Sequence, residues 1–186
     1  MILATSAVHS HLTRKGLRTF TSLNVRSAEC VDPHYFAVII GAGATVVNAY
    51  LAEDSLADRI ERGLLEGSLT EIVSRYRNAI DQGLLKIMAK MGISVISSYR
   101  GGLNFEAVGL SRAMCAEYFP GLISRISGIG VSGVQKKTMD IHVTGWGATD
   151  SVLPIGGFYK SRRSGETHAW EAQSMHMMPV SYTHLT

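Results

Sequence analysis

A long amphipathic helix is the feature that most limits how this chain can fold. Ser68 and Glu71 form a capping box, in which each side chain satisfies a backbone N–H of the first helical turn. Gly83 lowers helix propensity by about 1 kcal/mol relative to alanine, so we expect a break or kink there. Gly92 ends the helix. Apolar residues recur every three or four positions, which predicts one buried face made of Leu69, Ile72, Val73, Tyr76, Ile80, Leu84, Ile87 and Met91.

The other segments alternate between strand and helix patterns. Asp32 and Pro33 suit the cap and first position of a helix, so a helix is expected over 34–40. Strands are predicted over 1–5, 19–25, 45–49 and 93–97. Further helices are predicted over 8–15, 51–65, 105–108, 111–118 and 134–143, with a flexible stretch over 127–133 and a linker over 145–154. This alternation predicts an α/β fold with a mostly parallel sheet, in which residues 155–178 are too few for a core of their own and the domain is incomplete.

Composition and charge exclude several classes of protein. The chain has 186 residues, 46% of them hydrophobic, and a formal charge of only +3, which argues against a disordered chain. The most apolar stretch, 36–47, is interrupted by glycines and falls short of the roughly 20 residues of a membrane span. The basic residues are spread out, and their one cluster, Lys160, Arg162 and Arg163, is typical of a solvated turn. We therefore expect neither a membrane nor a nucleic acid as partner.

Neither the cysteines nor the histidines form a metal or catalytic pattern. Cys30 and Cys115 lie far apart without a CxxC pairing, and residues 1–5 lack the basic region of a signal peptide, which indicates a cytoplasmic protein. His9 and His11 would face one side only in a strand, whereas their segment has a helix pattern. There is no GxSxG, HExxH or P-loop. The sequence therefore assigns no catalytic, cofactor-binding or metal-binding residue.

The glycine-rich run from Val38 to Val46 has two interpretations. In the first, a strand that ends in GxGxxG aims backbone amides at a pyrophosphate. Val46 stands where the third glycine belongs, and the helix start at Asp32 inverts the required order of strand and helix. In the second, the glycines cap a helix and turn the chain into the next strand. A freestanding nucleotide- or small-molecule-binding module that uses the Gly41–Thr45 turn is the alternative function.

The loop over 97–102 is the best candidate for a working surface, because α/β sheets place ligand loops after buried strands. An arginine among hydroxyls and glycines can grip a carboxylate or phosphate. It can also pin one domain to another through backbone carbonyls, and this second role is the one we predict. Ser98, Tyr99 and Arg100 are therefore a candidate interdomain contact.

A series of short segments points to one protein family. The most specific runs over 83–94 and continues through Ser98-Tyr99-Arg100 to 105–110. The others are 3–9, 24–29, 32–38, 41–45, 49–52, 124–128 and 156–159. In this order, and over about residues 1–178, the chain resembles the large (alpha) subunit of bacterial glutamate synthase.

The resemblance implies that 1–150 are the C-terminal part of the central domain and that 151–178 are a linker and the start of the FMN-binding domain. In that family a glutaminase domain releases ammonia from glutamine. An FMN domain, which receives electrons through a 3Fe-4S cluster, reduces the imine formed with 2-oxoglutarate. The implied parent is an oxidoreductase of nitrogen assimilation. Its partners are its own glutaminase and FMN domains and a small subunit or ferredoxin. The family's nucleophilic cysteine, flavin segments and cluster cysteines have no counterpart here, so the fragment is expected to bind no cofactor and to be inactive alone.

The last eight residues depart from the resemblance. The family continues a helix where this chain has Pro179–Thr186, which resembles translated adaptor sequence. We expect residues 179–186 to be a non-native tail, and Met1 to be an internal methionine of the parent.

Overall fold

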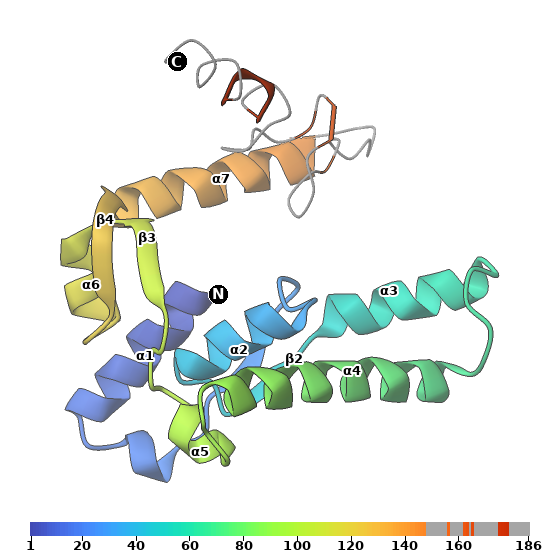
Figure 1. The fold of residues 1–186 in the computed structure, drawn as a ribbon, viewed down its shortest axis with the longest axis horizontal. Coiled ribbons are helices and arrows are strands. Elements are labelled where there is room, and N and C mark those ends of the chain that lie inside the picture. The colour runs from blue at the N-terminus through green and yellow to red at the C-terminus, as the bar shows by residue number, and fades with distance from the viewer. Residues whose placement is uncertain (148–155, 157–161, 164, 166–174, 179–186) are drawn as a thin grey trace. The chain divides into compact units, whose positions relative to one another are not determined.

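The structure is a computed structural model that describes residues 1–147, 156, 162–163, 165 and 175–178 (Figure 1). The chain divides into two compact units, Met1–Lys137 and Thr138–Thr186. In chain order the elements are α1 (Ile2–Arg14), the 3₁₀ helix η1 (Arg18–Phe20), β1 (Asn24–Arg26), α2 (Pro33–Gly41), β2 (Val46–Asn48), α3 (Tyr50–Glu61), α4 (Leu69–Lys90), α5 (Ile96–Tyr99), β3 (Glu106–Leu110), α6 (Arg112–Tyr118), β4 (Ile123–Ile129) and α7 (Val131–Gly147).

Two pairs of parallel strands define the class of the fold. β1 pairs with β2 in the register Asn24↔Val46, and β3 pairs with β4 with two register shifts along the pair. Each parallel pair is connected through a helix, α2 in the first and α6 in the second. The predicted α/β class with parallel pairing is confirmed, in a small and incomplete domain.

The core of the first unit forms around α2, which is apolar on nearly all sides. The side chain of Asp32 caps this helix by accepting hydrogen bonds from the backbone N–H groups of His34 and Tyr35, at 2.8 and 3.2 Å, and Pro33 occupies the first turn. The predicted helix start is therefore confirmed. The main core cluster joins α2 to the strand pair, α3 and α4 through Val25, Cys30, Phe36, Ile39, Ala44, Ala49, Ala52 and Ile80.

The predicted capping box and long helix are confirmed in α4. The Ser68 backbone N–H donates to the Glu71 carboxylate at 3.0 Å, and the Ser68 hydroxyl accepts from the Glu71 backbone N–H at 3.4 Å. The expected break at Gly83 is wrong, because α4 is a helix of 22 residues that runs through Gly83 without interruption. A Cβ at Gly83 would lie 2.6 Å from the Cβ of Pro33. Glycine is needed here because it lets α2 approach α4, and the helix tolerates its low propensity.

Replacing Gly83 with alanine should therefore destabilise the chain, although helix propensity alone favours alanine by about 1 kcal/mol. We expect the clash with Pro33 to lower the free energy of unfolding by about 1–3 kcal/mol, as overpacking of a core does. Urea denaturation followed by circular dichroism measures the change. The matched control is Gln82→Ala at the exposed neighbouring position. Equal or greater stability of the Gly83→Ala variant would contradict the packing argument.

The predicted strand over 1–5 is wrong, because these residues begin α1. The buried face of α1 consists of the hydroxyl-bearing residues Thr5, Ser6 and Ser10 and not of apolar side chains. The hydroxyls of Ser6 and Ser10 both donate to the backbone carbonyl of Tyr118, at 2.6 and 3.3 Å, which ties α1 to the end of α6. The helix predicted over 8–15 is confirmed as the second half of α1.

Several other short elements differ from their predictions. The expected strand over 19–25 is reduced to β1 after η1, and the expected buried strand over 93–97 is replaced by the short helix α5. The expected helix over 105–108 is replaced by β3, and the stretch predicted to be flexible over 127–133 contains the end of β4 and the start of α7. For β3 and β4 the physical reason is tertiary, since the two strands pair with each other and pack against α6, which buries Ala107 of β3 and Met114 and Cys115 of α6. The predictions for β2, α3, α6 and α7 are confirmed, with boundaries that differ by a few residues.

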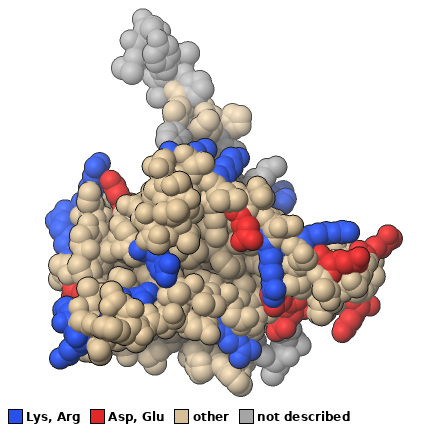
Figure 2. All heavy atoms as spheres, turned by 90° about the horizontal axis from the view of Figure 1, so that it is seen from below, with Lys and Arg blue, Asp and Glu red and all other residues tan. Residues whose placement is uncertain are grey.

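Some predictions fall on residues that the structure does not describe. They include the domain boundary at 150, most of 151–178, the tail 179–186 and Lys160 of the basic cluster. Arg162 and Arg163 are described and exposed. On the face drawn in Figure 2, the Lys and Arg side chains are scattered and do not form one stripe. The expectation that the chain binds no nucleic acid stays a prediction.

Candidate functional site

Four segments that are distant in the sequence meet around Gly43. They are His9 of α1, Arg18 of η1, the turn 41–45 between α2 and β2, and the loop 101–105 after α5. We call these residues the glycine junction. The junction brings together three features that the sequence offers separately: His9, the glycine turn and the end of the loop 97–102, which carries the candidate contact.

Arg18 holds the junction together through its whole guanidinium group. Its Nε donates to Nδ1 of His9 at 2.9 Å, and one terminal nitrogen donates to the backbone carbonyl of Thr21 at 2.6 Å. The other terminal nitrogen donates to the Gly43 carbonyl at 2.8 Å and to the Thr45 hydroxyl at 3.2 Å. The planar, five-donor fork of arginine suits such a set of acceptors. The sequence alone did not single out Arg18, since nothing in its local sequence distinguishes it.

Glycine is required in the turn because other groups approach its backbone closely. Gly43 has a φ of +117°, and a Cβ on it would lie 2.4 Å from Nδ1 of His9. A Cβ on Gly41 would lie 2.7 Å from the Phe105 ring. Gly101, with a φ of +72°, would place a Cβ 3.0 Å from Cε1 of His9. The glycines therefore make room for side chains of the chain itself.

The geometry of this turn does not support the nucleotide-binding alternative. The turn follows helix α2 and leads into strand β2, which is the reverse of the order that a dinucleotide fingerprint requires. The space beside Gly43 is filled by His9 and Arg18. The interpretation of the glycines as a helix end and a tight turn is the one that the structure supports.

The pKa of His9 is lowered below its ordinary value near 6.5, first by burial and second by the charge of Arg18. The unfolded chain then binds a proton at a higher pH than the folded chain does. The stability that neutral His9 contributes is therefore fully present above about pH 6.5 and is lost as the pH falls from there toward its lower folded pKa. Protonation of Nδ1 also removes the acceptor that Arg18 uses.

We expect the free energy of unfolding to decrease as the pH is lowered from about 7 to 5, and His9→Gln to reduce that slope. His11→Gln on the exposed side of the same helix is the matched control and should keep the slope of the parent chain. Denaturant titrations at several pH values measure both. An unchanged slope in the His9→Gln variant would show that this histidine does not carry the dependence.

The loop that carries the candidate contact is docked onto the end of α2. The Gly101 backbone N–H donates to the Ile40 carbonyl at 3.1 Å, and the Leu103 N–H donates to the Gly41 carbonyl at 3.2 Å. Tyr99 is buried in a cluster with Ala37 and Met88.

The three candidate contact residues therefore have different surroundings. Ser98 is exposed, Arg100 is half-buried, and Tyr99 lies inside the unit. Tyr99 anchors the loop, whereas Ser98 and Arg100 remain accessible. That these residues contact another domain stays a prediction.

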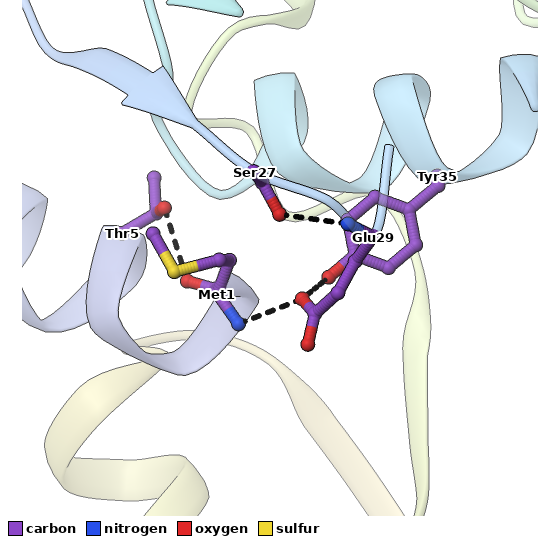
Figure 3. Close-up of polar contacts among 5 residues, drawn as sticks. All are labelled: Met1, Thr5, Ser27, Glu29 and Tyr35. Carbon is purple, nitrogen blue, oxygen red and sulfur yellow. Dashed lines mark hydrogen bonds and ion pairs between the residues drawn. The ribbon is translucent and has the colours of Figure 1, made fainter. Parts of the chain in front are cut away.

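A second polar cluster, which the sequence did not reveal, surrounds Glu29 (Figure 3). The Glu29 carboxylate accepts a hydrogen bond from the Tyr35 hydroxyl and pairs with the amino group of Met1 at 2.9 Å. The backbone N–H of Glu29 donates to the Ser27 hydroxyl at 3.1 Å. Partial burial raises the pKa of Glu29, but the hydrogen bonds from Tyr35 and the amino group outweigh it, so the pKa lies below its usual value. The hydrogen bonds of Ser27 and Tyr35 with Glu29 fix the segment between β1 and α2.

The described residues offer no metal centre and no membrane span. No three His, Cys, Asp or Glu side chains in this part of the chain gather where they could hold a metal ion. Cys30 and Cys115, both buried, are free thiols. Among the helices that the structure describes, none is long and apolar enough to cross a membrane.

Comparison with known proteins gives one consistent family. Residues 1–111 match the family described as glutamate synthase central domain. The glutamate synthase [NADPH] large chain of Azospirillum brasilense is 59% identical over 183 residues, which are 98% of this chain and 12% of that protein. The large chain of Bacillus subtilis (strain 168) is 40% identical over 178 residues, or 95% of this chain and 12% of that protein. Ferredoxin-dependent glutamate synthase 2 of Synechocystis is 34% identical over 194 residues, covering 97% of this chain and 12% of its own length.

Proposed function

This chain belongs to the glutamate synthase family as a segment of the large chain that includes central-domain sequence, and we propose that it joins the glutaminase site to the FMN-bearing synthase site. The observation that carries the proposal is the match of residues 1–111 to the central domain together with the identity to large chains over almost the whole segment. The chain spans 12% of the length of these relatives. Catalysis would then belong to the rest of the large chain, and this segment would connect its parts.

The proposed parent makes glutamate from glutamine and 2-oxoglutarate in the cytoplasm. It would carry FMN and a 3Fe-4S cluster, which supply the electron transfer for reduction of the imine. The described residues of this segment contain no group of three possible metal ligands, so we assign none of them to the cluster. NADPH is the favoured electron donor, because the two large chains of 59% and 40% identity are both named for NADPH. A small subunit is then the proposed electron-transfer partner.

The contacts around Arg100 support the proposal that this segment holds a neighbouring domain in a fixed position. Arg100 lies between two anchors, buried Tyr99 on one side and the backbone hydrogen bonds of Gly101 and Leu103 to the end of α2 on the other. The end of α2 is itself held by the glycine junction. A loop fixed at both ends loses little further entropy when a neighbouring domain binds it. Arg100 is therefore our choice for the residue that docks another domain through backbone carbonyls or a carboxylate.

The test is a chimera in which this chain replaces the aligned segment of the Azospirillum large chain. Arg100→Ala should increase the ammonia released per glutamine consumed, because poor docking of the domains lets ammonia escape before it reaches the synthase site. Glutaminase activity and thermal stability of the chimera should remain. Arg59→Ala on the exposed part of α3 is the control. Unchanged stability together with unchanged coupling in the Arg100→Ala chimera would refute the docking role.

A further inference from the structure

A groove of about 160 Å³ lies between α1 and β1. Asn24 and Val25 both line it, although successive residues of a strand point to opposite faces. The groove therefore follows the edge of β1 and not one of its faces. Its remaining walls are mostly aliphatic and come from Met1, Ala4, Thr5, Val8 and Leu23.

The edge of β1 at the groove is the one that β2 does not use. The Leu23 carbonyl accepts from the Val46 N–H at 3.1 Å, and the Ser27 N–H donates to the Asn48 carbonyl at 3.1 Å. Backbone groups of successive residues in a strand point to alternate edges, so those of Asn24 and Arg26 point away from β2. Among the described residues β1 pairs with β2 alone. An unpaired edge of this kind can accept another strand.

The order of the elements indicates the direction of the strand that is missing. β1, α2 and β2 already form one unit in which a helix connects two parallel strands. α1 leads through η1 into β1, which is the place of a crossover helix for another parallel strand. Parallel sheets are normally buried on both faces, and a sheet of only two strands is marginal by itself. A third strand beside β1 would extend the sheet and fill the groove under α1.

We propose that the groove takes an extended β-strand of the same large chain, parallel to β1, which pairs with the backbone of Asn24 and Arg26. Its side chains would be aliphatic where they face Ala4, Val8 and Leu23, because those residues form the apolar walls. Val8 is 48% exposed without such a cover. The relatives are long enough to supply the strand, since this chain spans 12% of the Azospirillum protein. The inference rests on membership of the family and is independent of the coupling role proposed for Arg100.

Amide hydrogen exchange tests the pairing in the unaltered Azospirillum large chain, at the positions aligned with residues 23–27. The amides aligned with Asn24 and Arg26 should exchange about 100-fold more slowly than the same amides in the isolated chain, because a strand partner protects them. The amides of Val25 and Ser27 face β2 and are the internal control, protected in both samples. If the amides aligned with Asn24 and Arg26 exchange in the large chain as fast as those of an exposed loop, the proposal is overturned. This holds for any exchange rate of the same amides in the isolated chain.

Alkylation of cysteines on α1 provides a second test in the chimeric large chain. Val8→Cys lines the groove, whereas His11→Cys lies on the exposed side of the same helix. With a strand in place, Val8→Cys should react with a maleimide at least about 10-fold more slowly than in the isolated chain, as a covered site does. Equal rates in both proteins overturn the proposal. If the Val8→Cys thiol of the isolated chain becomes more protected from the maleimide as the protein concentration rises, a second copy of the chain occupies the groove. That result also overturns the proposal.

Discussion

Replacing Gly43 with alanine is expected to lower the free energy of unfolding by about 2–5 kcal/mol, the largest loss that we predict for this chain. Two costs add at this position. The backbone has a φ of +117°, which residues with a side chain rarely adopt, and the new Cβ would lie 2.4 Å from Nδ1 of His9. His9 cannot withdraw freely, because the same nitrogen accepts the hydrogen bond of Arg18. Urea denaturation of the two chains measures the difference.

Gly16 provides the matched control for this substitution. It also has a positive φ, of +69°, but nothing lies within 4 Å of its virtual Cβ. Gly16→Ala should therefore cost only the conformational part, about 1–2 kcal/mol. A His9→Ala change made together with Gly43→Ala should restore part of the lost stability, because it removes the two closest contacts, Nδ1 and Cγ of His9, and leaves the contact with its Cβ at 2.8 Å. If Gly43→Ala costs no more than Gly16→Ala, the glycine junction does not depend on close approach.

The second large effect is expected at Arg18. Arg18→Ala removes four hydrogen bonds to His9, Thr21, Gly43 and Thr45 at once, and it takes the donor from two part-buried acceptors, Nδ1 of His9 and the Gly43 carbonyl. We expect a loss of about 2–4 kcal/mol in the free energy of unfolding. Lysine should restore little, since a point charge with a single nitrogen cannot reach acceptors on several sides. Thermal and urea denaturation of Arg18→Ala and Arg18→Lys measure these losses.

Arg62 is the control for Arg18. It forms an exposed ion pair with Asp58 at 3.3 Å within α3 and its loop, and such a pair contributes little in water. Arg62→Ala should change the free energy of unfolding by less than about 0.5 kcal/mol. The Arg18→Ala chain should also lose part of the pH dependence that His9 carries, because the charge of Arg18 helps to lower that pKa. A loss at Arg18 no greater than at Arg62 would contradict its role in the junction.

The elements that could be predicted were those with strong local signals. The capping box at Ser68 and Glu71 and the cap at Asp32 both mark helix starts that the structure contains. Such signals depend on side chains bonding the backbone of their own turn, so no distant contact is needed. The strand over 93–97 and the helix over 105–108 were wrong because each is too short for its periodicity to distinguish helix from strand.

The candidate site was predictable only in part. The sequence identified the loop at Ser98–Arg100 and the glycine turn as separate features, and the structure places them in neighbouring segments. The importance of Arg18 was not predictable, because its acceptors lie up to 27 residues away in the sequence. Tyr99 is buried in the interior of the unit, which the sequence did not indicate, and its predicted contact with another domain stays a prediction. Burial of a single aromatic side chain in a short loop has no periodic signature.

The sequence by itself determined the family, the α/β class and the long helices, since these depend on residue order, periodicity and capping within one segment. Only the tertiary structure decided that Gly83 packs against Pro33, that the first residues form a helix and not a strand, and that the glycine junction assembles. The physical reason is the same in each case. These features depend on atoms from distant segments that come within hydrogen-bonding or van der Waals distance only after the chain has folded.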